Sequence, residues 1–236
     1  MANTKTLSVM RQNCGNNVQD TSTAMGTLID VWLNDCYTDI SRRCNWSALI
    51  DDNFTFETVV DQATYTFSDL TMTDFEEELF MANIAQGYKL DRDTEGNWWT
   101  NRANAFQDDA IPSGTPYRYV ILEEAASFKI DPAPSVAETY AMPYKKCVTL
   151  LTSDAHTVVI RDIEKLMEEF ATGQALAYKR QYQKADWYLQ RFEYDLRKRI
   201  GEERSKINQR YQMISDSFRT TGGIKRLTGD QSYDSL

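Results

Sequence analysis

The sequence predicts an α+β protein: an α-helical bundle, made of an N-terminal helix and a long C-terminal helix pair, with an inserted β-rich module and an extended C-terminal tail. Two stretches with apolar residues three and four positions apart predict the helices. Between them, apolar and polar residues alternate in short runs, which is typical of strands. The predicted parts are 1–50, the N-terminal arm and helix; 51–152, the β-rich module; 153–212, the helix pair; and 213–236, the tail.

The N-terminal part is predicted to hold one helix, over 24–44. Residues 1–20 are polar, and the Cys-Gly-Asn-Asn sequence at 14–17 predicts a turn. The Thr-Ser-Thr sequence at 21–23 supplies capping residues, and Trp46 is expected to cover the other end of the helix. The predicted apolar stripe consists of Leu28, Val31, Trp32, Cys36, Ile40 and Cys44.

Short strands are expected throughout the inserted module. Trp98 and Trp99 are predicted to form one of them, and 101–116 a loop. Pro143 confines the last strand, 138–151, to a sheet edge or a bulge because proline has no amide proton to donate. The other expected strands are 54–59, 65–67, 88–90, 117–122 and 127–130, and the pattern at 74–80 favours neither helix nor strand.

The C-terminal helix pair carries most of the helical apolar surface. Its sequence contains no proline up to residue 211, and Ser153 and Asp154 stand before it as candidate N-caps. One unbroken helix of this length would be longer than the domain, so we expect a reversal at the polar patch 179–184. The residues expected in the core of the pair are Ile163, Phe170, Tyr178, Tyr188, Phe192 and Leu196.

Charge is unevenly distributed along the chain. The net charge is −9; residues 1–155 carry 11 basic and 23 acidic side chains, and residues 156–236 carry 15 and 12. An acidic body argues against a protein that reads nucleic-acid sequence, which needs a basic face. No apolar run has the length of a signal peptide core or a membrane span, so we expect no membrane association.

Residues for catalysis or metal binding are scarce. The four cysteines lack CxxC spacing and are interpreted as reduced packing thiols, and the one histidine, His156, is expected in the first turn of a helix. No phosphate-binding loop, dinucleotide fingerprint or nucleophile motif occurs. Adjacent acidic residues, as at 76–78, are more simply solvated surface. The sequence therefore predicts no enzyme, no metal site and no cofactor.

Aromatic residues of the β-rich module leave a second interpretation open. They could form a sugar-binding face or a stacking platform for nucleic acid. Alternating aromatics on strands are more often core residues, which we favour. The residues concerned are Trp98, Trp99, Tyr117, Tyr119, Tyr140 and Tyr144.

The tail at 216–236 is polar, with glycines at 222, 223 and 229, and predicts an extended or disordered segment. Spaced apolar residues within it suit a segment that becomes ordered on a partner. A frayed chain end is the simpler interpretation.

Four pieces of the sequence follow one another in a distinctive order. They are 28–46; 55–67 followed by Asp74-Phe75; 117–134 with Phe128-Lys129-Ile130-Asp131-Pro132-Ala133-Pro134; and 175–196 with Lys184-Ala185, Tyr188 and Phe192-Glu193. In this order they resemble the head-to-tail adaptor proteins of tailed bacteriophages, also called connector or head-completion proteins. The polar segment 93–116 departs from that pattern.

The resemblance implies a structural protein of the virion neck, made in the host cytoplasm. It implies a ring of twelve copies that docks under the portal protein, contacts the tail or the next neck protein, and surrounds passing genomic DNA without reading its sequence. The helix-pair residues above would also pack the ring. The tail residues that would bind the portal are Phe218, Ile224, Lys225, Arg226, Leu227 and Tyr233.

Three alternatives remain at this point. A tail-side gatekeeper or tail tube protein of a short-tailed phage belongs to the same structural class. A carbohydrate- or receptor-binding module would use the aromatic strands. An enzyme would need a carboxylate pair that no sequence motif reveals.

Overall fold

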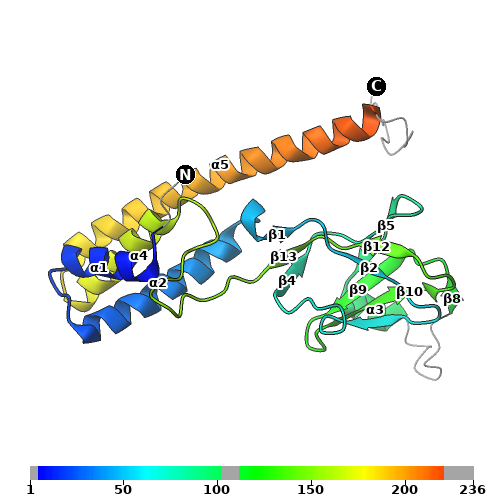
Figure 1. The fold of residues 1–236 in the computed structure, drawn as a ribbon, viewed down its shortest axis with the longest axis horizontal. Helices are drawn as coiled ribbons and strands as arrows, with labels where there is room; N and C mark the ends of the chain where they lie inside the picture. The colour runs from blue at the N-terminus through cyan, green and yellow to red at the C-terminus, as the bar shows by residue number, and fades with distance from the viewer. Residues whose placement is uncertain (1–4, 102–111, 221–236) are drawn as a thin grey trace. The chain divides into compact units, whose positions relative to one another are not determined.

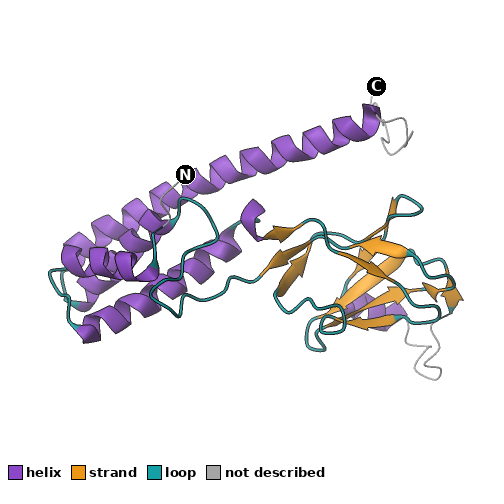
Figure 2. Cartoon of the chain, viewed as in Figure 1, coloured by secondary structure: helices purple, strands orange, loops and turns teal. Residues whose placement is uncertain are grey.

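A computed structural model describes residues 5–101 and 112–220, with the backbone alone for 99–101 and 207–220. The chain divides into two units: Met1–Ser47 with Asp162–Leu236, and Ala48–Arg161. Helices make up the described part of the first unit and strands predominate in the second (Figures 1 and 2). The predicted α+β class is confirmed.

In the helical unit, α4 lies between the other helices and packs against α1, α2 and α5 (Figure 1). Lys179, just before α5, pairs with Asp20, just before α2, so the two helices begin close together. At the end of α2, Arg43 pairs with Glu193 of α5. α2 and α5 therefore run in the same direction. The helices are α1 (Leu7–Asn17), α2 (Thr23–Arg43), α4 (Glu164–Tyr178) and α5 (Tyr182–Thr220).

The capped helix predicted at 24–44 is confirmed as α2. The Ser22 hydroxyl accepts a hydrogen bond from the Met25 amide, at 3.3 Å. At the other end, the buried indole of Trp46 donates to the Ile40 carbonyl, at 2.8 Å. The apolar stripe was partly wrong, because Val31 is 51 % exposed. The buried face of α2 consists of Met25, Ile29, Leu33, Cys36, Tyr37, Ile40 and Ser41.

The turn predicted at 14–17 is wrong, since these residues form the end of α1. Leu7, Met10 and Cys14 are three and four positions apart and are all buried. Burial of this short stripe outweighs the weak helix propensity of the surrounding Asn and Gly residues. The helix ends before Gln19, whose φ is 52°.

The predicted reversal in the C-terminal run is confirmed. α4 ends at Tyr178 and α5 begins at Tyr182, and Arg180 between them has a φ of 59°. The amide of Gln181 donates to the Leu176 carbonyl at 2.8 Å, which closes the end of α4.

The predicted start of that run is wrong. Ile163, not Ser153 or Asp154, is the N-cap of α4, and His156 lies outside any helix. The Thr-Val-Val-Ile sequence at 157–160 disfavours helix because β-branched side chains lose rotamer freedom there. Asp162, with a φ of 62°, separates this segment from α4.

At its C-terminal end α5 continues to Thr220, past residue 213, where the tail was predicted to begin. Residues 202–220 contain neither glycine nor proline, so nothing in the sequence stops the helix there. The predicted portal-binding residues Ile224, Lys225, Arg226, Leu227 and Tyr233 lie outside the described residues, as does the side chain of Phe218.

The second unit is built from short, mostly antiparallel strands. Its four-stranded sheets have the orders β3-β10-β9-β7 and β2-β12-β5-β6. A three-stranded sheet has the order β1-β13-β4, and β11 pairs with β8 in a two-stranded sheet. The strands are β1 (Ile50–Asp51), β2 (Thr55–Glu57), β3 (Thr64–Thr66), β4 (Phe75–Glu78), β5 (Ala82–Asn83), β6 (Tyr88–Lys89), β7 (Asp91–Asp93), β8 (Ser113–Gly114), β9 (Arg118–Leu122), β10 (Ser127–Asp131), β11 (Ala133–Pro134), β12 (Thr139–Ala141) and β13 (Tyr144–Lys146).

Two sequence predictions for this unit were wrong. Trp98 and Trp99 belong to a helix, α3 (Glu95–Asn101), because the Thr94 hydroxyl caps it by accepting from the Asn97 amide at 3.3 Å. The strand predicted over 138–151 is split into β12 and β13, and Pro143 stands between them.

Candidate docking surfaces of the helical unit

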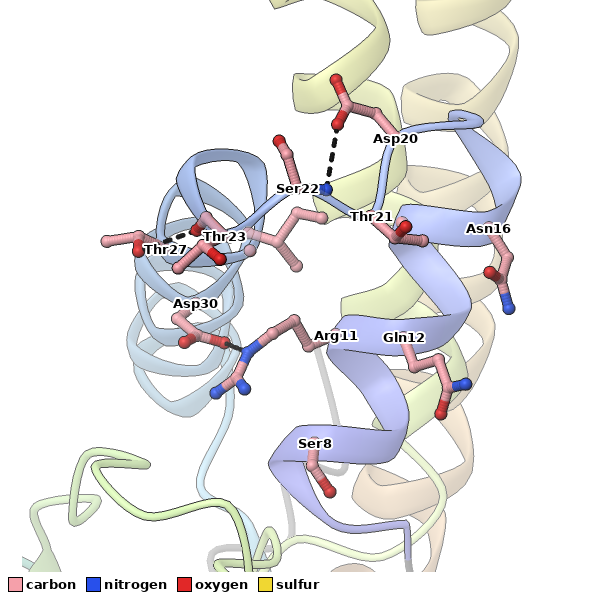
Figure 3. Close-up of a pocket in the computed structure, with 13 residues that line it drawn as sticks. Ser8, Arg11, Gln12, Asn16, Asp20, Thr21, Ser22, Thr23, Thr27 and Asp30 are labelled. Atoms are coloured by element: carbon pink, nitrogen blue, oxygen red, sulfur yellow. Dashed lines mark hydrogen bonds and ion pairs between the residues drawn. The ribbon is translucent and has the colours of Figure 1, made fainter.

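A polar groove of about 680 Å³ lies between α1 and α2 (Figure 3). Ser8, Gln12 and Asn16 of α1 line one side of it, and Thr23 and Thr27 of α2 the other. The sequence analysis missed this groove because it placed no helix at α1. The stripe of Leu7, Met10 and Cys14 was the signal that could have found it.

Gly26 lets the walls of the groove approach each other. A Cβ atom at Gly26 would lie 3.2 Å from Cδ of Arg11, whose side chain crosses α2 there. Arg11 reaches across the groove and donates to Asp30 at 2.7 Å. Asp20 accepts from the Ser22 amide at 3.2 Å and pairs with Lys179, also at 3.2 Å.

The side chains that line the groove offer polar contacts. Hydrogen bonds from the side chain and backbone of Ser22, together with Lys179, lower the pKa of the Asp20 carboxyl. Both carboxylates that line the groove are partnered, Asp20 by Lys179 and Asp30 by Arg11. Among the side chains that the structure describes, in 5–98 and 112–206, no group of three or more His, Cys, Asp or Glu could hold a metal ion.

Glu168 of α4 holds α1 in place. Its carboxylate accepts from the Lys5 ammonium at 2.7 Å and from the Asn13 amide group at 2.7 Å. Two of its neighbours along α4, Ala171 and Thr172, are buried. A charged hydrogen-bonded pair at such a partly buried position contributes more than an exposed ion pair.

The contact between α4 and α5 depends on a close approach at Gly173. An added Cβ would lie 2.9 Å from the Leu189 side chain and 3.4 Å from the Ala185 carbonyl oxygen. Beside this point the rings of Phe170 and Phe192 lie 5.2 Å apart. Burial raises the pKa of Glu169, while Arg191, at 3.0 Å, opposes that shift.

Glu203 fixes α5 to the segment that follows α2. The buried carboxylate accepts from the amide of Ser47, at 3.0 Å, and from its hydroxyl. Arg199 contacts the same carboxylate at 3.4 Å and stacks over the Trp46 ring, 5.6 Å from its centre. Burial tends to raise the pKa of Glu203, but the Ser47 hydrogen bonds and the nearby cations lower it overall.

Two outer helix faces carry exposed apolar side chains. On α5, Trp187 is 54 % and Tyr194 72 % exposed. On α2, Val31 is exposed and Leu28 is half-buried. These faces point away from the core, because residues two positions earlier lie on the opposite side of a helix and are buried. They are Ala185 before Trp187, Phe192 before Tyr194, and Ile29 before Val31.

The residues predicted for the core of the helix pair differ in how deeply they are buried. Ile163, Phe192 and Leu196 are buried, and Phe170 and Tyr188 are half-buried. Tyr178 is 65 % exposed at the end of α4, where its ring lies 6.2 Å from that of Trp32.

The aromatic residues of the second unit do not form a common exposed face. Trp98, Tyr119, Tyr140 and Tyr144 are buried, Tyr117 is exposed, and the Trp99 side chain lies outside the described part. Tyr119, Tyr140 and Tyr144 belong to a core with Phe56 and Phe128, and Trp98 belongs to a smaller cluster with Val120 and Leu122. The ring centre of Phe56 lies 5.3 to 5.9 Å from those of Tyr65, Phe128 and Tyr140.

The four cysteines form no disulfide. Cys14, Cys36 and Cys44 are buried, as packing thiols should be, and burial raises the pKa of Cys14 to about 12 and raises that of Cys36. Cys147 is exposed, contrary to the packing interpretation. Among the helices described, none has the length and apolar character needed to span a bilayer.

A family model for the SU10 adaptor protein matches residues 5–217. The chain belongs to the SU10 adaptor family. The match extends over both units, and the resemblance to phage adaptor proteins is confirmed at this level. No curated protein matches the chain.

Proposed function

We propose that this SU10 adaptor family member is a head-to-tail adaptor, which docks as a ring under the portal and joins the DNA-filled capsid to the tail. The observation that carries the proposal is the family match over 5–217, which includes the helical unit and the β-rich unit together. In this role the ring forms part of the DNA channel in the virion neck.

The physical features of the chain support a role in docking. Polar and apolar surfaces lie on the outside of the helical unit, and the carboxylates of its groove, Asp20 and Asp30, are paired with Lys179 and Arg11. The net charge of −9 limits adhesion to passing DNA, because like charges repel. The burial of Tyr119, Tyr140 and Tyr144 gives no support to a sugar-binding face.

The test is electron microscopy of the purified chain mixed with the portal protein of the same phage. We expect a ring added to one end of the portal, and no addition in the presence of tail components alone. A chain that joins tail assemblies and ignores the portal would favour the tail-side gatekeeper and contradict the adaptor.

We assign the portal contact to the end of the chain, with Phe218, Ile224, Lys225, Arg226, Leu227 and Tyr233 as its binding residues. Spaced apolar and basic side chains on a polar segment suit a groove on a partner. A chain that ends at Thr220, which keeps Phe218 and lacks the other five assigned residues, should lose portal addition. The double variant Thr228→Ala, Ser232→Ala is the control, because it changes the same segment and keeps every assigned residue. Normal portal addition by the shortened chain would overturn this assignment.

A further inference from the structure

The outer faces of α2 and α5 have matching spacing. Ala24, Leu28, Val31 and Asp35 are separated by four, three and four positions, and so are Trp187, Arg191, Tyr194 and Lys198. Residues spaced in this way form one straight stripe on a helix, the spacing used where two helices pack side by side.

The two stripes differ in size and charge in a complementary way. The α2 stripe begins with a small residue and ends with a carboxylate, and Thr23–Ser41 contains three aspartates but no lysine or arginine. The α5 stripe begins with a large aromatic residue and ends with an exposed ammonium. Arg191 stacks over Trp187, 5.2 Å from the ring centre, and holds it in place.

Within one chain the two stripes cannot meet. α4 lies between α2 and α5 and packs against both (Figure 1). The exposed stripe residues Val31 and Tyr194 lie away from it, while Arg191 pairs with Glu169 of α4 at 3.0 Å. α2 and α5 also run in the same direction, as the Asp20–Lys179 and Arg43–Glu193 ion pairs show. A second copy related by a small rotation therefore brings its α2 beside this α5 in a parallel orientation.

We infer that the α5 stripe of one copy docks on the α2 stripe of a second copy. In parallel register, Trp187 packs over Ala24, Tyr194 beside Val31, and Lys198 reaches Asp35. The contact is head to tail, so each copy keeps one free face, and repetition closes a ring where the rotation allows it. The inference rests on the proposed function only for the closed ring.

Cysteine cross-linking tests the contact. Full-length chains carrying Cys147→Ser with Val31→Cys are mixed with chains carrying Cys147→Ser with Tyr194→Cys, alone and with portal, and then oxidised. We expect cross-linked dimers only in the mixture. Val9→Cys in place of Val31→Cys is the matched control, because Val9 is 42 % exposed on α1, outside the stripe. Equal cross-linking with Val9→Cys, or none with Val31→Cys, would overturn the inference.

A charge exchange gives an independent readout. Asp35→Lys and Lys198→Asp should each weaken self-association in sedimentation by about tenfold, as expected when a like-charge pair is created in an interface. The double variant should recover most of the loss. No recovery would overturn the Lys198–Asp35 pairing.

The outcomes separate this inference from the proposed function. Cross-linked rings that do not join the portal would contradict the adaptor and support the contact. Chains that join the portal without cross-linking would contradict the contact and leave the adaptor standing. If Tyr194→Glu removes portal addition while self-association is unchanged, the stripe binds the portal and the inference is wrong.

Discussion

At the scale of single residues, Gly173 sets how closely α4 and α5 pack. Because an added Cβ would lie 2.9 Å from the Leu189 side chain, Gly173→Ala should lower the free energy of unfolding by about 1–3 kcal/mol. Urea unfolding followed by circular dichroism measures this change. Leu189→Ala in the same chain should return part of the loss by making room.

Gly201→Ala is the matched control for that experiment. Nothing lies within 4 Å of an added Cβ at Gly201, which is also on α5. Alanine is a better helix former than glycine, so the change should raise stability by up to about 1 kcal/mol. Loss of stability at both positions would show that the contact at Leu189 is not what matters.

The lowered pKa of Glu203 predicts that the free energy of unfolding depends on pH. Its pKa in the folded protein is below its usual value, so its contribution is present at neutral pH and is lost as pH falls through the lowered pKa. Glu203→Gln should cost about 1–3 kcal/mol at pH 7, since the charged hydrogen bonds with Ser47 and Arg199 are weakened.

The same comparison at lower pH tests the cause. The difference in unfolding free energy between the parent chain and Glu203→Gln should shrink below about pH 4.5, where the carboxylate begins to lose its advantage. Glu202→Gln serves as the control because that side chain is half exposed and lies 3.8 Å from Arg199. A difference that stays constant down to pH 3 would rule out the carboxylate as its source.

At the scale of elements, sequence patterns predicted those helices that have caps and long stripes. α2 has Ser22 and Trp46 at its ends, and the reversal before Tyr182 coincides with a run of polar residues. α1 was missed because three buried residues among Asn and Gln give a weak period, and its stability comes from packing that the sequence does not display.

The docking faces show a related limit of sequence analysis. The stripe predicted as the core face of α2 is buried at Cys36 and Ile40, but its first part, Leu28 and Val31, lies beside the buried positions Ile29 and Leu33. Two apolar stripes on one helix cannot be assigned to core or surface by period alone. Only the positions of α1 and α4 decide between them.

The corrected α1 leads to a prediction at this scale. Met10 is fully buried, so Met10→Ala should lower the free energy of unfolding by about 2–5 kcal/mol. Val9→Ala, at an exposed neighbouring position, should change it by less than about 0.5 kcal/mol. If both variants unfold at the same urea concentration as the parent, α1 does not pack on the bundle in solution.

At the scale of the whole molecule, the chain combines two units whose cores are made from different segments. The helical core draws on both ends of the sequence, so it cannot form until residues after 161 have been synthesised. The core of the β-rich unit lies within one continuous segment, around residues such as Phe56, Phe128 and Tyr140. The family match includes both units.

This organisation predicts that the segment 48–161 folds when it is produced alone. Its core contains at least ten buried apolar side chains, among them Tyr119, Phe128 and Ile130. No disulfide bond joins this segment to the helical unit. We expect a near-ultraviolet circular dichroism signal from its buried tyrosines and a cooperative loss of that signal in urea.

Phe128→Ala should destabilise the isolated segment by about 3–5 kcal/mol, while Val60→Ala, at an exposed site, should leave it nearly unchanged. A segment that shows far-ultraviolet signal without near-ultraviolet signal would be compact but loosely packed. The β-rich unit would then depend on the helical one for its folding.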